Sequence, residues 1–198
     1  GPAFEGAGIS RGMGGVPGAI DKVWAANNAL DAHVIGGGEP RGICGSGLID
    51  AVAALLSLRV IDRNGTMEGD FTPIAGDICL TQRDIRQVQL AKAAVAAGID
   101  TLLETAGVAA RDVSALYIAG GFGSHLNLRS AAAIGLLPRS LAPKTRVLGN
   151  AALDGACQLL LDDSLRKTAD AVARVAVPVQ LSGNPLFAEK YIRQMDFG

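Results

Sequence analysis

Apolar side chains recur at helical spacing in two long stretches of the chain. The first stretch follows a glycine-rich segment and carries Leu48, Ile49, Val52, Leu55 and Leu56. The second has an apolar residue every three or four positions, at Ile85, Val88, Ala91, Val95, Ile99, Leu102 and Ala106. Each stretch therefore predicts an amphipathic helix, and the second is predicted to be the longest helix of the protein.

The start of this long helix is marked by Thr81 and Asp84, whose spacing resembles a capping box. Gly107 is expected to end it. Its polar positions are expected to face solvent, and they are Gln82, Arg83, Arg86, Gln87 and Lys92. Three of these side chains are also long enough to reach a nucleotide or a neighbouring domain, namely Arg83, Gln87 and Lys92, so this alternative stays open.

Short apolar runs predict the strands. Residues 115–119 and 146–148 each form such a run next to glycine, and both are expected to be buried strands. Residues 19–25 and 32–35 are expected to pair as a hairpin through the Asn-Asn sequence between them.

Two weaker segments complete the strand prediction. Residues 175–181 are expected to form a last strand, which Pro178 places at the edge of a sheet. Residues 69–76 are expected to be irregular chain around Pro73.

The predicted buried strands are each followed by a glycine turn and a helix. Asn127 is expected to cap the first of these helices, which runs to about residue 134, and the turn at Gly149-Asn150 is expected to lead into the second. A final helix is predicted over residues 185–195. This succession is typical of an α/β fold. Because the chain has 198 residues, of which 49% are hydrophobic and 19% charged, we expect a single domain over residues 1–198.

The charge balance limits the classes of partner. Eighteen Lys and Arg residues stand against 19 Asp and Glu, the net charge is −1, and no basic run occurs. Nucleic acid is therefore not an expected partner, because binding a phosphate backbone needs a concentration of positive charge. No apolar run reaches the roughly 20 residues that span a bilayer, and no export signal is present, so no membrane association is expected.

The three cysteines are odd in number and far apart in the sequence. Cys44, Cys79 and Cys157 show no Cys-x-x-Cys spacing, which argues against a disulfide framework and against a zinc or iron-sulfur site within this chain. They are expected to be buried thiols of a cytosolic protein.

A first candidate site follows the predicted strand at residues 115–119. Glycine permits backbone angles and close approaches that a Cβ prevents, so a flat ligand can lie against Gly120, Gly121, Phe122 and Gly123. A strand followed by two glycines also occurs wherever an α/β protein needs a tight corner, and this alternative remains open.

A second candidate site is formed by Gly45, Ser46 and Gly47. Here a glycine-rich loop meets the start of the first predicted helix, where free backbone N–H groups attract an anion such as phosphate. Ser46 is alternatively the N-cap of that helix. The segment is not a P-loop, because no Lys followed by Ser or Thr comes after the glycines. The lone carboxylate of Glu5 is expected to be a solvated charge.

Five blocks of the sequence together resemble the C-terminal part of the reductive activators of corrinoid proteins. They are GPAFEGA at residues 1–7, GICGSGLID at 42–50, LTQRDIRQVQLAK at 80–92, AGGFG at 119–123 and GNAA at 149–152. They occur in the family's order and cover nearly the whole chain. The resemblance implies an α/β fold, a ribonuclease-H-like lobe of the actin, sugar-kinase and chaperone ATPase superfamily, with a mixed sheet and flanking helices.

The resemblance also implies an activity. Such activators use ATP with Mg to drive electrons from an upstream [2Fe-2S] ferredoxin domain onto Co(II) corrinoid, which returns to the Co(I) state needed for methyl transfer. The expected partners are the corrinoid protein of a methyltransferase system and the upstream lobe of the same polypeptide, with a homodimer as a further candidate assembly. The expected location is the cytoplasm.

In that superfamily the nucleotide lies between two lobes, and a strand-Gly-Gly turn holds its adenosine. The resemblance places that turn at residues 118–123, and it places both phosphate hairpins upstream of residue 1, so the chain is expected to be a piece of a longer protein. The sequence departs from the family pattern at Arg11 and at the pair Ser124-His125. These departures affect the expected fine specificity of the site and not the resemblance to the family.

The alternative function is a docking or dimerisation module that shares the ATPase fold.

Overall fold

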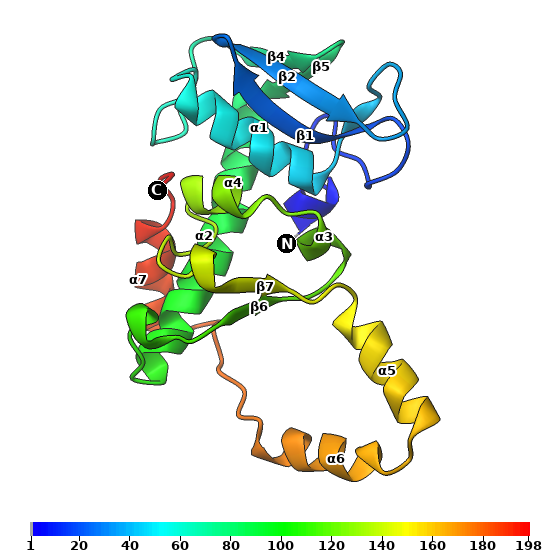
Figure 1. Cartoon of the computed structure of the whole chain (residues 1–198). Helices are drawn as coiled ribbons and strands as arrows, with labels where there is room; N and C mark the ends of the chain where they lie inside the picture. The colour runs from blue at the N-terminus through cyan, green and yellow to red at the C-terminus, as the bar shows by residue number, and fades with distance from the viewer. Residues whose placement is uncertain (1) are drawn as a thin grey trace.

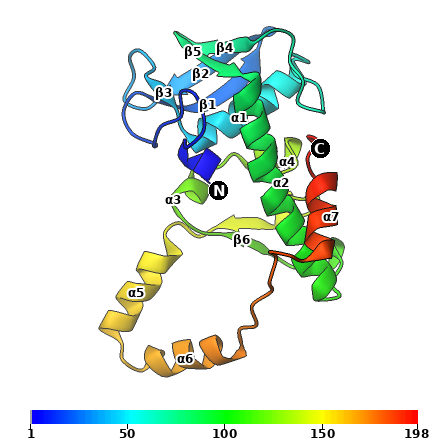
Figure 2. The same cartoon turned by 180° about the vertical axis from the view of Figure 1, so that it is seen from behind.

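The computed structural model describes residues 2–198, so Gly1 of the first quoted block lies outside the described residues. The elements form three parts (Figure 1): a mixed sheet covered by one helix, a long helix that runs away from it, and a small parallel sheet from which a helical arm projects. The view from behind shows the same arrangement (Figure 2).

The mixed sheet has the strand order β2-β1-β3. β1 (Ala19–Ala26) pairs antiparallel with β2 (Ala29–Val34), and β3 (Gly42–Ile43) runs parallel to β1. Asn27 and Asn28 form the turn with φ angles of 48° and 62°, a left-handed conformation that asparagine tolerates better than most residues. The predicted hairpin is confirmed, and β2 begins earlier than expected.

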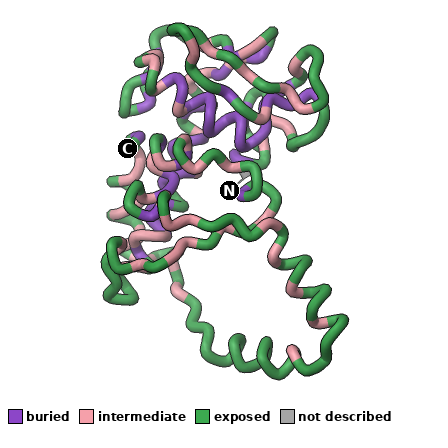
Figure 3. Tube along the Cα trace, viewed as in Figure 1, coloured by how far each residue is buried: buried purple, intermediate pink, exposed green. Residues whose placement is uncertain are grey.

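α1 (Gly45–Ser57) packs against β1, as its apolar spacing predicts. Its inward positions Leu48, Ile49, Val52 and Leu55 are completely or almost completely buried. They form the centre of the hydrophobic core, drawn in purple in Figure 3, together with Ile20, Ile43, Leu80, Ile85, Val88, Ile134 and Phe197. The core therefore lies between the mixed sheet, α1 and the first half of the long helix.

The prediction of irregular chain over residues 69–76 is wrong. β4 (Phe71–Ala75) and β5 (Ile78–Thr81) form an antiparallel hairpin, in which Pro73 lies opposite Cys79. A two-stranded ribbon leaves one edge of each strand unpaired, so a proline, which has no N–H to donate, is tolerated there. Pro73 was therefore a misleading signal for a break.

α2 (Gln82–Thr105) is the longest helix among the described residues, as predicted. The capping box is also confirmed, because Thr81 Oγ1 accepts from the backbone N–H of Asp84 while Asp84 Oδ2 accepts from that of Thr81 at 2.8 Å. Gly107, with φ of 66°, follows the end of the helix.

The apolar face predicted for α2 is correct only in its first half. Leu102 is half exposed, whereas Lys92 is fully buried. α7 (Pro185–Arg193), the predicted last helix, lies beside α2 in both views (Figures 1 and 2). The small side chains of Ala93, Ala96 and Ala97 are buried in α2 and let neighbouring chain approach closely.

The parallel sheet consists of β6 (Leu116–Ile118) and β7 (Thr145–Val147). Both strands occur where they are predicted, but the expectation that they are buried is wrong, since Tyr117 is 56% and Val147 is 43% exposed. The reason is that β6 and β7 pair only with each other among the described strands, so much of their surface stays uncovered.

Short helical elements connect these parts. η1 (Pro2–Glu5), η2 (Ala110–Asp112) and η3 (Ala142–Lys144) are 3-10 turns, and α3 (Gly121–Ser124) directly follows the glycine turn after β6. α4 (Leu128–Ala133) begins as predicted, because Asn127 Oδ1 accepts from the backbone N–H groups of its first turn.

The arm contains α5 (Ala151–Leu161) and α6 (Leu165–Val175). α5 follows the Gly149-Asn150 turn as predicted, and Asn150 Oδ1 caps it by accepting from the backbone N–H of Leu153. Neither helix has a buried residue, and the arm is drawn almost entirely in the exposed colour in Figure 3. The predicted edge strand at 175–181 is wrong: α6 extends to Val175, and the extended chain around Pro178 has no strand partner among the described residues.

None of the helices within residues 2–198 combines the length and the apolar character that crossing a membrane requires.

Candidate functional site

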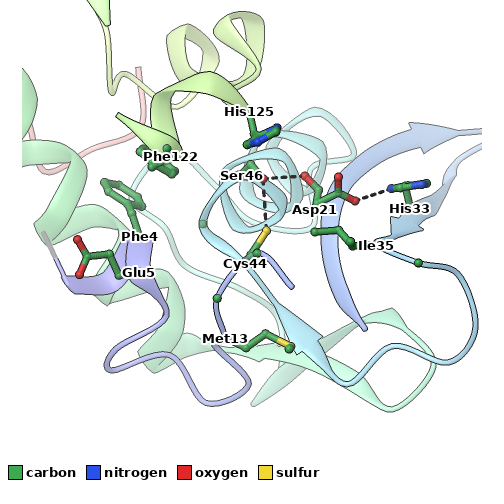
Figure 4. A pocket seen from close by; sticks show the side chains of 15 residues that line it. Phe4, Glu5, Met13, Asp21, His33, Ile35, Cys44, Ser46, Phe122 and His125 are labelled. Atoms are coloured by element: carbon green, nitrogen blue, oxygen red, sulfur yellow. Dashed lines mark hydrogen bonds and ion pairs between the residues drawn. The ribbon is translucent and has the colours of Figure 1, made fainter. Parts of the chain in front are cut away.

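A cavity of about 690 Å³ lies between η1, the β1–β2 hairpin, the start of α1 and α3 (Figure 4). Its wall is more apolar than polar and consists of Phe4, Glu5, Met13, Gly14, Gly15, Asp21, His33, Ile35, Gly36, Cys44, Gly45, Ser46, Gly121, Phe122 and His125. The cavity thus brings together members of both glycine segments singled out from the sequence, although these segments are far apart in the chain.

The start of α1 forms one side of the cavity. The N-cap residue is Cys44, which has extended backbone angles and provides no side-chain cap. The prediction that Ser46 is the N-cap is wrong, because the helix begins at Gly45 and Ser46 lies inside its first turn. Ser46 Oγ instead donates to the backbone oxygen of Asp21 at 3.0 Å, which ties α1 to β1. The uncapped N–H groups of this turn remain at the positive end of the helix dipole.

Gly45 and Gly47 are needed for packing. A Cβ on Gly45 would lie 2.0 Å from the backbone oxygen of Phe4, and one on Gly47 would lie 2.2 Å from that of Ile20. Gly45 lines the cavity and Gly47 does not. The helix therefore approaches η1 and β1 as closely as it does only because both positions lack side chains.

The segment after β6 forms the opposite side of the cavity. Gly120 has φ of 102°, and a Cβ on Gly123 would lie 2.3 Å from Ile118 Cγ2, so these two glycines shape the turn itself. Neither lines the cavity. Gly121 does, and no atom lies within 4 Å of the position of its missing Cβ, so there is open space in front of its backbone. Phe122 lies beside it on the wall.

Phe122 joins the two sides of the cavity. Its ring stacks on that of Phe4, with ring centroids 5.5 Å apart and an interplanar angle of 8°. An offset stack of this kind contributes on the order of 1 kcal/mol beyond the buried area. Glu5, expected to be a solvated charge, is exposed but also stands at the rim of the cavity next to this stack (Figure 4).

Asp21 and His33 are the polar pair that the sequence analysis missed. His33 Nδ1 lies 2.5 Å from Asp21 Oδ1, and both residues line the cavity (Figure 4). A regular register would place Asp21 away from His33, but the β1–β2 pairing shifts between Ile20 and Lys22. This bulge brings the two side chains together. The predicted Asn-Asn turn gives the register of the hairpin, but the sequence has no signal for the bulge.

The polar face of α2 does not reach the cavity. Gln82 donates to the backbone oxygen of Gly65 at 2.7 Å, and Arg86 donates to that of Asn64 at 2.8 Å, so these side chains hold the preceding loop. Arg83 is exposed and Gln87 is half-buried. Neither lines the cavity.

Lys92 contradicts the expectation of a solvated charge. Its ammonium group donates to the backbone oxygen of Asp196 and lies 5.7 Å from the centre of the Phe197 ring. Burial lowers the pKa of Lys92 to about 8, and the nearby Asp196 opposes this effect. Lys92 therefore anchors the end of the chain to α2.

A smaller groove of about 240 Å³ lies beside β1, where α1 meets α4. Trp24, Asp50, Asn127, Arg129 and Ser130 line it, among others. Asp50 is 4% exposed, and its Oδ1 has no hydrogen-bond partner. Burial raises the pKa of Asp50, and the neighbouring polar groups of Ser130, Val23 and Asn127 only partly oppose this effect.

The cysteines differ in environment. Cys44 is buried in the cavity wall with its Sγ 3.4 Å from Ser46 Oγ, Cys79 is half-buried, and Cys157 is exposed on the arm. The expectation of three buried thiols is therefore wrong for Cys157, because it lies on the arm, whose two helices contain no buried residue. Over residues 2–198, the His, Cys, Asp and Glu side chains nowhere form a group of three that could hold a metal ion.

Comparisons with known proteins agree with the resemblance noted above. The model of the family described as the C-terminal domain of RACo, the ASKHA domain, matches residues 1–198. The corrinoid activation enzyme RamQ of Eubacterium limosum is 35% identical over 226 residues, covering 100% of this chain and 38% of the relative. The Co(II) methylated amine-specific corrinoid protein reductase of Methanosarcina barkeri is 30% identical over 186 residues, covering 83% of this chain and 34% of the relative.

A solved structure described as a reductive activator for corrinoid, iron-sulfur protein has a TM-score of 0.89 and 33% sequence identity, and the match covers 100% of this chain and 35% of that one. The predicted fold class, an α/β fold with a mixed sheet and flanking helices, is confirmed by this match and by the family model. The chain spans somewhat more than a third of the length of these relatives.

Proposed function

The chain belongs to the family of RACo C-terminal ASKHA domains, and we propose that it is the nucleotide-binding part of an ATP-dependent reductive activator of a corrinoid protein. In this proposal, the complete activator returns Co(II) corrinoid to Co(I) for methyl transfer, and residues 1–198 form one lobe of its ATPase-like unit. Two relatives, one named a corrinoid activation enzyme and the other a Co(II) methylated amine-specific corrinoid protein reductase, support this assignment.

The observation that carries the nucleotide proposal is the single cavity between the turn after β6 and the start of α1. The adenine ring of the nucleotide would lie against Gly121 and Phe122, where the open space in front of the Gly121 backbone provides room for a flat ring. The phosphates of the nucleotide would extend toward Gly45 and Ser46, where uncapped N–H groups favour an anion. Gly47, Gly120 and Gly123 would contribute by shaping these two segments rather than by contact.

The remaining parts of the site would come from other parts of the activator. We infer that hairpins of the upstream lobe hold most of the phosphate charge and the Mg ion, and that a [2Fe-2S] domain supplies the electron. Nucleotide binding can drive the uphill reduction only by favouring one conformation of the complex over another. The role of residues 1–198 would thus be to link nucleotide binding to the arrangement of the lobes.

The test is a titration of this chain and of its Gly121→Val variant with Mg-ATP. Binding is monitored through the NMR signals of His125, which lies in the cavity wall. The valine side chain would fill the space proposed for the ligand, so we expect affinity to fall about tenfold or more. Gly155→Val on the exposed arm is the matched control, because its missing Cβ also faces open space. Equal affinity of a folded Gly121→Val variant and the wild type would refute this site.

The second candidate function is a docking or dimerisation module. It is favoured by the arm, where Leu160 and Leu161 are 80% and 88% exposed without a partner among the described residues. Such a module requires no nucleotide. The absence of any ATP response in the cavity would therefore favour it, whereas a response that Gly121→Val abolishes would favour the nucleotide-binding lobe.

A further inference from the structure

Asp21 and His33 form a polar pair on the cavity wall that the proposed function does not yet use. The side chain of His33 is 55% exposed and that of Asp21 is 16% exposed. Because the two residues come from paired strands of one hairpin, the backbone ladder of β1 and β2 holds them in place. A ligand would therefore meet a largely preorganised pair.

The hydrogen bond between them defines what the pair offers to a ligand. When the imidazole is neutral, Nδ1–H donates to Asp21 Oδ1, and Nε2 of His33 is left as an acceptor. Asp21 Oδ2 is a second acceptor, and neither atom has a hydrogen-bond partner among the described residues. Two neighbouring acceptors are matched by a group that brings two neighbouring donors.

Within a nucleotide, this requirement selects the ribose. Its 2′ and 3′ hydroxyl groups are donors on adjacent carbons, and a carboxylate is a frequent partner of ribose hydroxyls in nucleotide sites. Phosphate oxygens are acceptors with negative charge, so the Asp21 carboxylate would repel them. The Ser46 hydroxyl donates to the Asp21 backbone oxygen, which places the pair next to the start of α1, where the phosphates are proposed to lie.

We propose that Asp21 and His33 bind the vicinal hydroxyl groups of the ribose and make the cavity selective for ribonucleosides over deoxynucleosides. This inference rests on the proposed function, because it requires that the cavity accept a nucleoside. It adds the sugar contact that the glycine segments do not provide.

The test compares adenosine with 2′,3′-dideoxyadenosine, which lacks both hydroxyl groups but has the same base. The protein contains two histidines, His33 and His125, and both line the cavity, so their imidazole NMR signals report on a ligand at two different points of its wall. We expect both nucleosides to shift the His125 signals and only adenosine to shift those of His33. Adenosine should bind about tenfold more tightly, which corresponds to one or two lost hydrogen bonds.

The variant Asp21→Asn keeps the shape of the side chain and removes the carboxylate acceptor. We expect it to reduce the difference between the two affinities from about tenfold to about threefold, because Nε2 of His33 still accepts from one hydroxyl group. If wild-type His125 responds to both nucleosides but the affinities are equal, the ribose assignment is wrong while the nucleotide cavity stands. If neither nucleoside shifts either histidine, the proposed function fails together with this inference.

Discussion

At the scale of single residues, Lys92 shows how a charged side chain on the predicted polar face of a helix can be fully buried. Its aliphatic stem lies in the core, while its ammonium group reaches the backbone oxygen of Asp196 and the ring of Phe197. The sequence around it shows only a lysine on the polar side of a helix. Its partners lie about a hundred residues further along the chain, which is why local pattern could not reveal its burial.

The lowered pKa of Lys92 predicts that stability rises with pH in the alkaline range. The pKa is about 8 in the folded protein against 10.5 as reference, so the unfolded chain binds more protons between these values. The cost of burying the charge is fully present below pH 8 and is removed as pH rises toward 10.5. From pH 7.5 to 9.5 we expect the free energy of unfolding to increase by roughly 2 kcal/mol, measured by urea denaturation.

The control for this measurement is Lys92→Met, which keeps a long apolar side chain and cannot titrate. Its stability should change much less over the same pH range, apart from the effect of other groups. If the variant and the wild type respond to pH in the same way, Lys92 does not carry the effect.

At the scale of elements, the capping box of α2 also anchors the N-terminal loop. Asp84 is fully buried, and its Oδ1 accepts from the backbone N–H of Ser10 at 2.7 Å and from the Ser10 hydroxyl at 3.0 Å. Its Oδ2 accepts from Thr81. One carboxylate thus joins the start of α2 to residues more than seventy positions earlier.

This geometry predicts unequal effects of two substitutions in the same capping box. Thr81→Ala should cost about 1 kcal/mol, the usual effect of losing an N-cap. Asp84→Ala should cost roughly 3 kcal/mol, because it leaves the N–H groups of both Ser10 and Thr81 without their acceptor. Denaturant unfolding followed by far-UV circular dichroism measures both. Equal costs would mean that the contact with Ser10 adds nothing.

The elements that sequence pattern predicted well are those with a local signal. The cap at Thr81, the Asn-Asn turn and the cap at Asn127 each occupy a few adjacent residues, and each was found where expected. The β4 strand was missed because Pro73 suggested a break.

The prediction of the candidate site was partial for the same reason. The glycine segments could be recognised locally, and the cavity brings Gly45, Ser46, Gly121 and Phe122 together. The function of Ser46 as a tie to β1, the bulge that joins Asp21 to His33 and the Phe4–Phe122 stack all depend on contacts between distant segments. Such contacts follow from packing, which the spacing of residues along the chain does not encode.

At the scale of the whole molecule, the chain combines a compact core with an uncovered part. The mixed sheet, α1 and the first half of α2 enclose one continuous core, whereas β6, β7 and the arm leave large apolar side chains exposed. Stability is therefore expected to be uneven, with the core unfolding cooperatively and the arm opening at little cost.

This division predicts that residues 1–198 fold by themselves but bind Mg-ATP only weakly. Most of the affinity of such a ligand comes from contacts to its phosphates and metal, which the proposal assigns to the upstream lobe. The remaining contacts must offset several kcal/mol lost in immobilising the ligand, so we expect a dissociation constant on the order of millimolar or higher. Calorimetric titration measures it. A micromolar constant would mean that a complete site lies within this chain.

The position of Trp24 determines which optical signals can follow these events. It is the single tryptophan of the protein, it is 46% exposed, and it lines the groove next to Asp50 rather than the cavity proposed to bind the nucleotide. Its fluorescence should therefore respond to a change in the contact between α1 and α4, and it should stay nearly silent when a ligand fills the cavity without moving α4. Because the indole is already half in water, its emission should shift only modestly to the red on unfolding.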